Sequence, residues 1–376
     1  KGCRDFFPAD MRVRNYLFDA MKKSAEAFAY EPYDGPLLEE VELYKAKSGE
    51  ELINDQIYGF TDRGGREVAI RPEMTPTIAR MVANIHKQAA KPLRWYAIPN
   101  LMRYEKPQRG RVREHWQYNV DIFGAKENLG ELEVLNLAVH FFTSLGATSE
   151  MFSIQVNDRR VVDAVFGAVL KLDDEKSHKL YKIIDKAKKV STEALDKMLA
   201  EVLDSDQTSK FKEYLAIDNA NKLATFIVEN DIQSSGENLA YLLNLAKDTG
   251  LESYIEFDPT IVRGLDYYTG LVFEVFDKHP ENRRALAGGG AYANLLGIFN
   301  EPALAGIGFG LGDVTLRDFL TTHEILPDLS KPNNDFFLTY SSDDQEAIAF
   351  AIATSLRALG LKVELNLGKM KFSKSH

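Results

Sequence analysis

The sequence predicts an α+β fold, in which strands pair through short turns and amphipathic helices pack beside them. The clearest strand signal lies in residues 101–124, because polar and apolar side chains alternate without a break from His115 to Phe123. Apolar residues recur at helical spacing before and after this segment. The stretch 163–250 is rich in Lys, Asp, Glu, Ala and Leu without alternation, which predicts a helical insertion.

Residues 101–124 are expected to form a strand, a loop and a second, half-buried strand. The polar face of the second strand can hold a small polar ligand and consists of His115, Gln117, Asn119 and Asp121. The loop carries five basic residues against one acid, a net charge of +4, which favours phosphate binding. The basic residues are Arg103, Lys106, Arg109, Arg111 and Arg113, around Gly110. A solvated arginine-rich turn is the alternative.

The first quarter of the chain predicts a helix and a hairpin. The helix covers residues 10–28, with Asp10 as its N-cap. Pro36 marks a sheet edge, a bend, a subunit interface or a plain loop, because proline cannot donate to a central ladder. Residues 57–70 predict a hairpin with its turn at 62–65.

A second helix is expected to begin at Thr75-Pro76, with Thr75 as the capping residue and Pro76 at the first helical position. Its buried face consists of Ile78, Met81, Val82 and Ile85. Glu73 then lies between a strand end and a helix N-terminus, where a carboxylate can receive a cationic ligand. Capping that helix is the alternative role for Glu73.

The second half of the chain adds strands at 151–157 and 271–276 and a helix that ends at Gly146. A strand follows in which Gly306, Gly308 and Gly310 alternate. This pattern leaves bare backbone, either for a flat ligand or for a closely packed helix.

After a linker at 332–334, residues 335–365 read as strand, helix and strand, the opening of a parallel α/β unit. One such unit is too small to bury a core, so we expect further chain beyond His376. The absence of methionine at Lys1 likewise indicates a fragment or a string of ordered residues, in which spacings across loops could be compressed.

Composition bounds the class of protein. The chain has 376 residues, of which 45% are apolar and 27% charged, which is typical of a globular enzyme. A net charge of −10 argues against a uniformly positive surface but leaves room for a local basic patch. The single cysteine, Cys3, excludes an intrachain disulfide framework and a zinc site built mainly on thiolates. No apolar run approaches the roughly 20 residues that span a bilayer, and we expect a cytoplasmic protein without membrane association.

These segments resemble the motifs of histidyl-tRNA synthetases, a family of class II aminoacyl-tRNA synthetases. The resemblance begins at KGCRDFFP, residues 1–8, and includes motif 1 at 10–44 and motif 2 at 101–124. Eight consecutive residues, RGLDYYTG at 263–270, resemble the histidine-specific segment of the family. RPEMT at 71–75 resembles the loop that holds the ammonium group of the amino acid.

Two segments resemble the family with substitutions. Residues 289–292, GGAY, resemble the second histidine loop, with Ala291 and Ala293 in place of its polar pair. Motif 3 of the class ends in an arginine that binds ATP, and the aligned residue here is Thr315. Another basic group must then replace that arginine, unless it is dispensed with.

The resemblance implies a class II antiparallel sheet flanked by helices, with a helical insertion and a partial C-terminal α/β anticodon-binding domain. The implied domains are a catalytic core in two parts, an insertion and the start of the anticodon-binding domain. They cover residues 1–162 and 251–331, 163–250, and 332–376, respectively.

The implied reaction is ATP-dependent ligation of L-histidine to its tRNA through histidyl-adenylate, with release of pyrophosphate. Mg²⁺ would bind the β- and γ-phosphates, and the enzyme would be a homodimer. Arg103, which resembles the motif 2 arginine, and Arg263 are the expected catalytic residues. The histidine-binding residues are expected to be Glu73, Thr75, Gln117, Asp121, Arg263, Tyr267, Tyr268 and Tyr292. The ATP-binding set is Arg103, Glu105, Arg111, Gly308 and Gly310, and the tRNA-binding set is Gln108, Arg109 and Arg111.

The geometry of the strand suggests how a histidine molecule would be oriented in the expected pocket. Gln117 and Asp121 share a face, with their Cα atoms about 13 Å apart. A histidine molecule could place its ammonium near Gln117, Glu73 and Thr75 and its ring near Asp121. Neutral imidazole needs one acceptor and one donor, which Asp121 and the Tyr268 hydroxyl would supply. The family more often has glutamate at position 121.

Two other functions remain open at this stage. One is a catalytically silent histidine sensor, like the synthetase-related regulatory subunit of ATP phosphoribosyltransferase. The unit at 335–365 and the intact segment 263–270 speak against it. The other is a tRNA-sensing pseudo-synthetase domain, which the absence of the motif 3 arginine keeps open.

Overall fold

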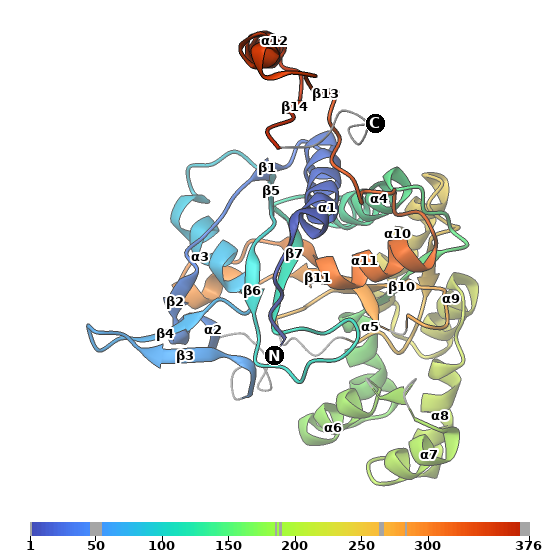
Figure 1. Ribbon diagram of the computed structural model, residues 1–376. Coiled ribbons are helices and arrows are strands. Elements are labelled where there is room, and N and C mark those ends of the chain that lie inside the picture. The colour runs from blue at the N-terminus through green and yellow to red at the C-terminus, as the bar shows by residue number, and fades with distance from the viewer. Residues whose placement is uncertain are drawn as a thin grey trace. The chain divides into compact units, whose positions relative to one another are not determined.

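The computed structural model describes residues 2–45, 55–184, 186–187, 190–262, 267–282 and 284–368 (Figure 1). Contacts between Cα atoms group the chain into two units. The first unit consists of Lys1–Asp5 and Tyr16–Leu326, and the second of Phe6–Asn15 and Pro327–His376. The insertion therefore belongs to the same unit as the core around it.

A mixed sheet forms the centre of the first unit, and among the described residues it has nine strands. Its order is β1-β5-β7-β12-β11-β10-β8-β9, with β6 paired to the first part of β7. Only the pairs β1/β5 and β8/β9 are parallel within this described sheet. The strands are β1 (Glu31–Pro32), β5 (Leu93–Ala97), β6 (Asn100–Met102), β7 (Glu114–Phe123), β8 (Phe152–Asp158), β9 (Ile255–Phe257), β10 (Leu271–Asp277), β11 (Ala285–Tyr292) and β12 (Gly306–Gly312). The predicted α+β class, with a mainly antiparallel sheet, is confirmed.

Helices cover this sheet, and none in the described part of the chain is both long and apolar enough to cross a membrane. The helices outside the insertion are α1 (Pro8–Ala27), α2 (Val41–Lys45), α3 (Thr75–Ile85), α4 (Leu129–Ser144), the 3₁₀ helix η4 (Leu295–Phe299) and α11 (Asp313–Thr322). Both α4 and α11 pack on β7 and β12. Tyr118 of β7 contacts Phe141 of α4 and Phe309 of β12, with ring centroids 5.5 and 5.7 Å apart.

The helical insertion predicted at 163–250 is confirmed as helical. Its helices are α5 (Arg159–Ala164), the π-helix η2 (Val165–Val169), α6 (Asp174–Ile184), α7 (Thr192–Ala200), α8 (Ser205–Leu215), α9 (Ala220–Glu229) and α10 (Gln233–Asp248). Phe211, Tyr214 and Phe226 form an aromatic core inside it. Because α10 packs on α4, α5 and β8, the insertion is built onto the sheet.

A second sheet contains the predicted hairpin. The strands β3 (Tyr58–Thr61) and β4 (Glu67–Ile70) pair antiparallel, and β2 (Leu38–Glu40) adds to β4. Asp62 holds the turn by accepting from the backbone N–H groups of Gly64 and Arg66 at 2.8 and 2.9 Å. Pro36 lies in the loop before β2, as in the plain-loop interpretation.

Both predicted capping residues are wrong. The first helix begins at Pro8, so Asp10 lies in its first turn. Met74 is the N-cap of α3, and Thr75 is already helical. The Thr75 hydroxyl instead accepts a hydrogen bond from the Tyr267 hydroxyl at 3.4 Å, a partner that local sequence cannot reveal.

The second unit contains the predicted strand, helix and strand. β13 (Phe336–Leu338) pairs in parallel with β14 (Val363–Leu365), and α12 (Glu346–Ala358) packs on β14 after the 3₁₀ turn η5 (Asp343–Gln345). Its buried core is small and consists of Ala349, Ala353, Val363 and Leu365. The C-terminal segment of this unit begins at Pro327, a few residues before the predicted linker at 332–334.

The pairing of β7 with β12 determines which side chains the sheet can display. Gly308 stands opposite Asp121, and Gly312 stands opposite Gln117. A Cβ atom on Gly308 would lie 2.2 Å from Asp121 Oδ1 and 2.5 Å from the Val120 carbonyl oxygen. The expectation that β7 is half-buried is wrong, because residues 118–123 are buried on both faces. The helices α4 and α11 pack on β7, and side chains of its polar face lie over glycines of β12.

We predict that Gly308→Ala destabilises the protein by at least about 2 kcal/mol, because the methyl group would overlap a backbone oxygen that cannot move aside. Equilibrium denaturation with urea measures the loss. The matched control is Gly167→Ala in η2, where no atom other than those of its chain neighbours and its own helix backbone lies within 4 Å of the new methyl group. That change should be neutral or stabilising by less than about 1 kcal/mol. Equal effects of the two substitutions would contradict this account.

Candidate active site

The floor of the candidate site is the glycine-bearing surface of β11 and β12. Four side chains lie on it, each above a glycine that leaves room for it: a Cβ on that glycine would come within 2.2–2.7 Å of the side chain. The pairs are Tyr292 over Gly306, Asp121 over Gly308, Gln117 over Gly310 and Tyr268 over Gly290. The predicted bare backbone is thus covered by the side chains that were expected to bind histidine.

Asp121 is the buried acid of this site. The Tyr292 hydroxyl donates a hydrogen bond of 2.5 Å to its Oδ1 atom. Burial raises the pKa of Asp121 to about 7, although the Tyr292 hydrogen bond lowers it in part. Burial, followed by the charge of Asp121, raises the pKa of Tyr292 well above its usual value. The pair therefore offers a carboxyl group that titrates near neutrality and a phenol that stays protonated.

The tyrosines of the histidine-like segment close over the same floor. The rings of Tyr267 and Tyr268 contact each other at 4.7 Å, and Tyr267 meets the Tyr292 ring edge-on at 6.2 Å. The Tyr267 hydroxyl lies 3.4 Å from Glu73 Oε2, and Glu73 is only 4% exposed. The structure thus brings together residues from the 71–75 loop, β7, the 267–268 segment and β11, as the sequence predicted.

His115 lies on the same strand face but does not serve as an acid or base at neutral pH. Burial and the positive charges of Arg103 and Arg4 lower its pKa to about 3. It is therefore a neutral imidazole beside the basic loop.

The base of the basic loop is joined to the Glu73 turn. Arg103 Nε donates to the Pro72 carbonyl at 2.8 Å, and the Met102 N–H donates to the Arg71 carbonyl at 3.1 Å. The Arg103 N–H also donates to the Arg113 carbonyl at 2.9 Å, which closes the loop where β6 and β7 meet. These bonds place the guanidinium of Arg103 next to the turn that carries Glu73.

The tip of the loop is a tight turn held by neutralised charges. Gln108 and Arg111 exchange backbone hydrogen bonds of 2.9 Å in both directions around Gly110, whose φ is +70°. Arg111 forms an ion pair with the buried carboxylate of Glu105. Arg109 forms an ion pair with Glu281 at 3.4 Å. Most of the basic residues thus have defined partners, unlike those of a freely solvated turn.

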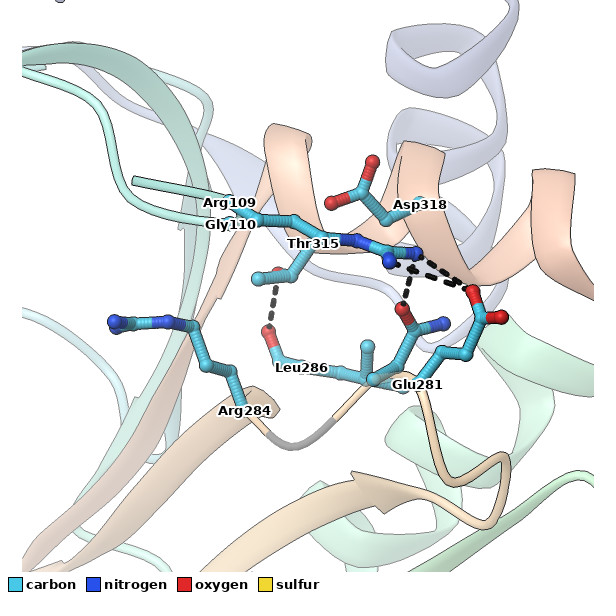
Figure 2. Close-up of a pocket in the computed structure, with 8 residues that line it drawn as sticks. Arg109, Gly110, Glu281, Arg284, Leu286, Thr315 and Asp318 are labelled. Atoms are coloured by element: carbon cyan, nitrogen blue, oxygen red, sulfur yellow. Dashed lines mark hydrogen bonds and ion pairs between the residues drawn. The ribbon is translucent and has the colours of Figure 1, made fainter. Parts of the chain in front are cut away.

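A pocket of about 170 Å³ lies beside this tip (Figure 2). It is bounded by the loop, the approach to β11 and the first turns of α11, and its lining residues are Arg109, Gly110, Glu281, Asn282, Arg284, Leu286, Thr315 and Asp318. Sequence reasoning singled out Arg109, Gly110 and Thr315 but missed Arg284. The sequence feature that could have pointed to Arg284 is the Arg283-Arg284 doublet directly before the glycine-rich strand.

A buried aspartate at the start of α11, also missed from sequence, holds β7 in place. Asp313 Oδ1 accepts from the Trp116 N–H at 3.0 Å, and its Oδ2 accepts from Arg4 Nη2 at 2.8 Å. Arg263, Gly264, Leu265 and Asp266 lie outside the described residues, so the expected role of Arg263 stays a prediction.

Comparison with known proteins agrees with this geometry. The model of the histidyl-tRNA synthetase family matches residues 2–314. This chain belongs to the histidyl-tRNA synthetase family. The resemblance inferred from the motifs is confirmed.

Relatives match over the length of the chain. A histidine–tRNA ligase of Leptospira biflexa is 44% identical over 378 residues, covering 100% of this chain and 85% of that protein. The chloroplastic/mitochondrial histidine–tRNA ligase of Arabidopsis thaliana is 37% identical over 370 residues, covering 98% of this chain and 74% of that protein.

Solved structures share the fold. The histidyl-tRNA synthetase of Nostoc sp. PCC 7120 matches with a TM-score of 0.86 at 22% identity, covering 100% of this chain and 86% of that one. A Bacillus halodurans protein described as an ATP phosphoribosyltransferase regulatory subunit/histidyl-tRNA synthetase matches with a TM-score of 0.83 at 22% identity, covering 99% and 94%. The class II arrangement expected from the resemblance is thereby confirmed as a fold.

We predict that Asp121 makes the stability of the protein depend on pH. Its pKa is about 7 in the fold against an ordinary value of 3.8, so between these values the folded state holds a proton that the unfolded state has lost. Stability contributed by this carboxyl therefore falls as pH rises through this window. Relative to Asp121→Asn, the wild type should lose up to about 4 kcal/mol between about pH 4 and pH 7.

Urea denaturation of both proteins at four pH values measures this difference. The asparagine variant keeps the size of the side chain and cannot titrate, so other ionisable groups cancel in the comparison. A difference that does not change with pH would show that Asp121 is an ordinary carboxylate.

Proposed function

We propose that this chain is a histidine–tRNA ligase, which activates L-histidine with ATP and transfers it to the 3′ end of its tRNA. The observation that carries the proposal is the joining of two groups of residues on one sheet surface: the Asp121–Tyr292 pocket and the arginine-rich loop closed by Arg103. Family membership and 44% identity over the full chain to a histidine–tRNA ligase support it. A silent sensor has no support from these features.

In the first step, a carboxylate oxygen of histidine attacks the α-phosphorus of ATP in line, and the bond to the pyrophosphate oxygen breaks. The products are histidyl-adenylate and pyrophosphate. The protein supplies position and positive charge, since no protein atom forms a covalent bond. We assign this task to Arg103 and Arg263, because guanidinium groups bind phosphate and carboxylate through two parallel hydrogen bonds and keep their charge.

Histidine is recognised by its two ends. The ammonium group would lie by Glu73, Thr75 and Gln117, beside the Tyr267 hydroxyl that already contacts Glu73 and Thr75. The ring would lie by Asp121, whose second oxygen remains to accept an imidazole N–H, with the Tyr268 hydroxyl as the donor on the other side. The substitution of aspartate for the usual glutamate shortens this acceptor, and the bond from Tyr292 holds it in one orientation.

ATP enters as its magnesium complex. Among the described residues no three His, Cys, Asp or Glu side chains cluster as a metal site. Mg²⁺ keeps several waters and commonly binds through phosphates with one or two carboxylates, so such a cluster is not required. Glu105 and Arg111, which pair with each other, are the further residues that we assign to ATP. Asp121 and Gln117 cover Gly308 and Gly310, so we no longer assign these two glycines to the nucleotide.

The remaining assignments concern larger partners. We assign Gln108, Arg109 and Arg111 at the loop tip to tRNA, where basic side chains contact phosphates. We also propose a homodimer through the segment 10–44, in which Leu37 and Leu38 are 50% and 46% exposed beside Pro36. The reaction would take place in the cytoplasm, where the exposed thiol of Cys3 stays reduced.

The decisive test of the function is histidine-dependent exchange of labelled pyrophosphate into ATP. Activation is reversible and needs no tRNA, so we expect exchange with L-histidine and none without it. The kcat/KM of exchange with other amino acids should be roughly 10⁴-fold lower than with histidine, because the wrong ligand leaves buried polar groups unpaired. Folded protein with no exchange would sink the enzyme assignment and favour the sensor.

Arg103→Gln tests the phosphate chemistry. Loss of a preorganised cation at the α-phosphate should lower the kcat of exchange by about 10²- to 10³-fold, while thermal unfolding changes little. The control is Lys210→Gln on the insertion, where Lys210 forms an exposed ion pair with Asp206. Near-normal exchange by the Arg103 variant would remove this residue from the mechanism.

A further inference from the structure

The start of α11 lacks the cation that motif 3 of class II enzymes carries there. Thr315 stands at that position, and its hydroxyl oxygen lies 3.2 Å from the Gly312 carbonyl oxygen and 3.3 Å from that of Leu286. The side chain therefore bonds to the local backbone, and it carries no charge. A nucleotide that depends on a third positive group must find it on another element.

Arg284 reaches the same place from the approach to β11. A Cβ atom on Gly110 would lie 3.0 Å from Arg284 Cδ and 3.5 Å from Thr315 Cγ2. The side chain of Arg284 thus lies against the tip of the basic loop, beside the first turn of α11, and Gly110, Arg284 and Thr315 all line the pocket. Figure 2 shows its guanidinium extending away from Glu281 and the Arg109 guanidinium.

Two carboxylates near this pocket pair with other arginines. Arg109 is neutralised by Glu281, and Arg111 is neutralised by Glu105. Among the residues that the structure describes, no carboxylate forms an ion pair with Arg284. Burial and then the charge of Arg111 lower the pKa of Arg284 below its ordinary value, against a smaller opposite effect of Glu105, and the guanidinium stays protonated at neutral pH. Binding of an anion would relieve both effects.

We propose that Arg284 binds the β- and γ-phosphates of ATP in the place that the motif 3 arginine takes in other class II enzymes. The inference rests on the proposed function for the identity of the nucleotide. Phosphate is the favoured ligand over the adenine ring, because a half-buried guanidinium beside a second arginine gains most from a multiply charged anion. Gly110 has a structural part in this, since a larger residue would displace the arginine.

Arg284→Gln tests the proposal in the exchange assay. We expect the KM for ATP to rise roughly 10- to 100-fold, as for loss of a charged hydrogen bond, while the KM for histidine stays unchanged. The matched control is Arg66→Gln at the β3–β4 turn, where Arg66 forms an exposed ion pair with Asp62. An equal rise in both Michaelis constants, or a rise in neither, would overturn the assignment.

Calorimetric titration separates a phosphate contact from a structural or adenine contact. The variant should bind ATP at least tenfold more weakly than the wild type but bind AMP equally well, because AMP lacks the β- and γ-phosphates. Equal weakening for ATP and AMP would overturn the phosphate assignment. Since titration needs no catalysis, it decides about Arg284 even if wild-type protein shows no exchange and the proposed function fails.

Moving the arginine from position 284 to position 315 tests whether a positive charge in this pocket is what ATP binding requires. In the double variant R284Q/T315R, the guanidinium is supplied from α11 into the same pocket. We expect ATP affinity to recover at least tenfold relative to R284Q, with thermal unfolding of both proteins close to wild type. No gain in affinity from a folded double variant would overturn the claim that Arg284 stands in for motif 3.

Discussion

The close approach of β7 to the glycines of β12 is the constraint on which the site depends. Asp121 can lie flat on the sheet only because Gly308 has no side chain, and the same holds for Gln117 over Gly310. Interiors are packed too densely for such side chains to share space with another Cβ. The glycines therefore leave room for these side chains on the sheet, and helices pack on the opposite face of β7.

On this floor the protein separates two kinds of chemistry. Around Asp121 the groups are phenols and buried acids, and burial raises the pKa of Asp121 itself. Around Arg103 the groups are guanidinium cations, most of which have carboxylate or carbonyl partners. The bond between Arg103 and the Pro72 carbonyl joins these regions through the turn that carries Glu73. An amino acid and a nucleotide can thus meet with their reacting groups between the two regions.

At the pocket beside Thr315, a residue from another part of the sequence can lie at the place in the fold where a motif residue is missing. Phosphate binding requires a positive charge at a given location, whichever helix, strand or loop carries that charge. Here Gly110 at the loop tip, which has no side chain, lets Arg284 pack closely against it. In our proposal, an arginine from the segment before β11 and an arginine from α11 are therefore alternative ways to supply one positive charge.

The sequence by itself determined the strand at 115–123, the hairpin at 58–70, the helical insertion and the family, because these depend on periodicities and motifs within a few residues. It misjudged the ends of two helices and the burial of β7, since Thr75 bonds to Tyr267 and the polar face of β7 at Asp121 is covered by Tyr292. Only the tertiary structure decided that Tyr292 donates to Asp121 and that Arg284 meets Gly110. Such contacts join distant segments, and they follow from strand order, register and burial, which no local pattern encodes.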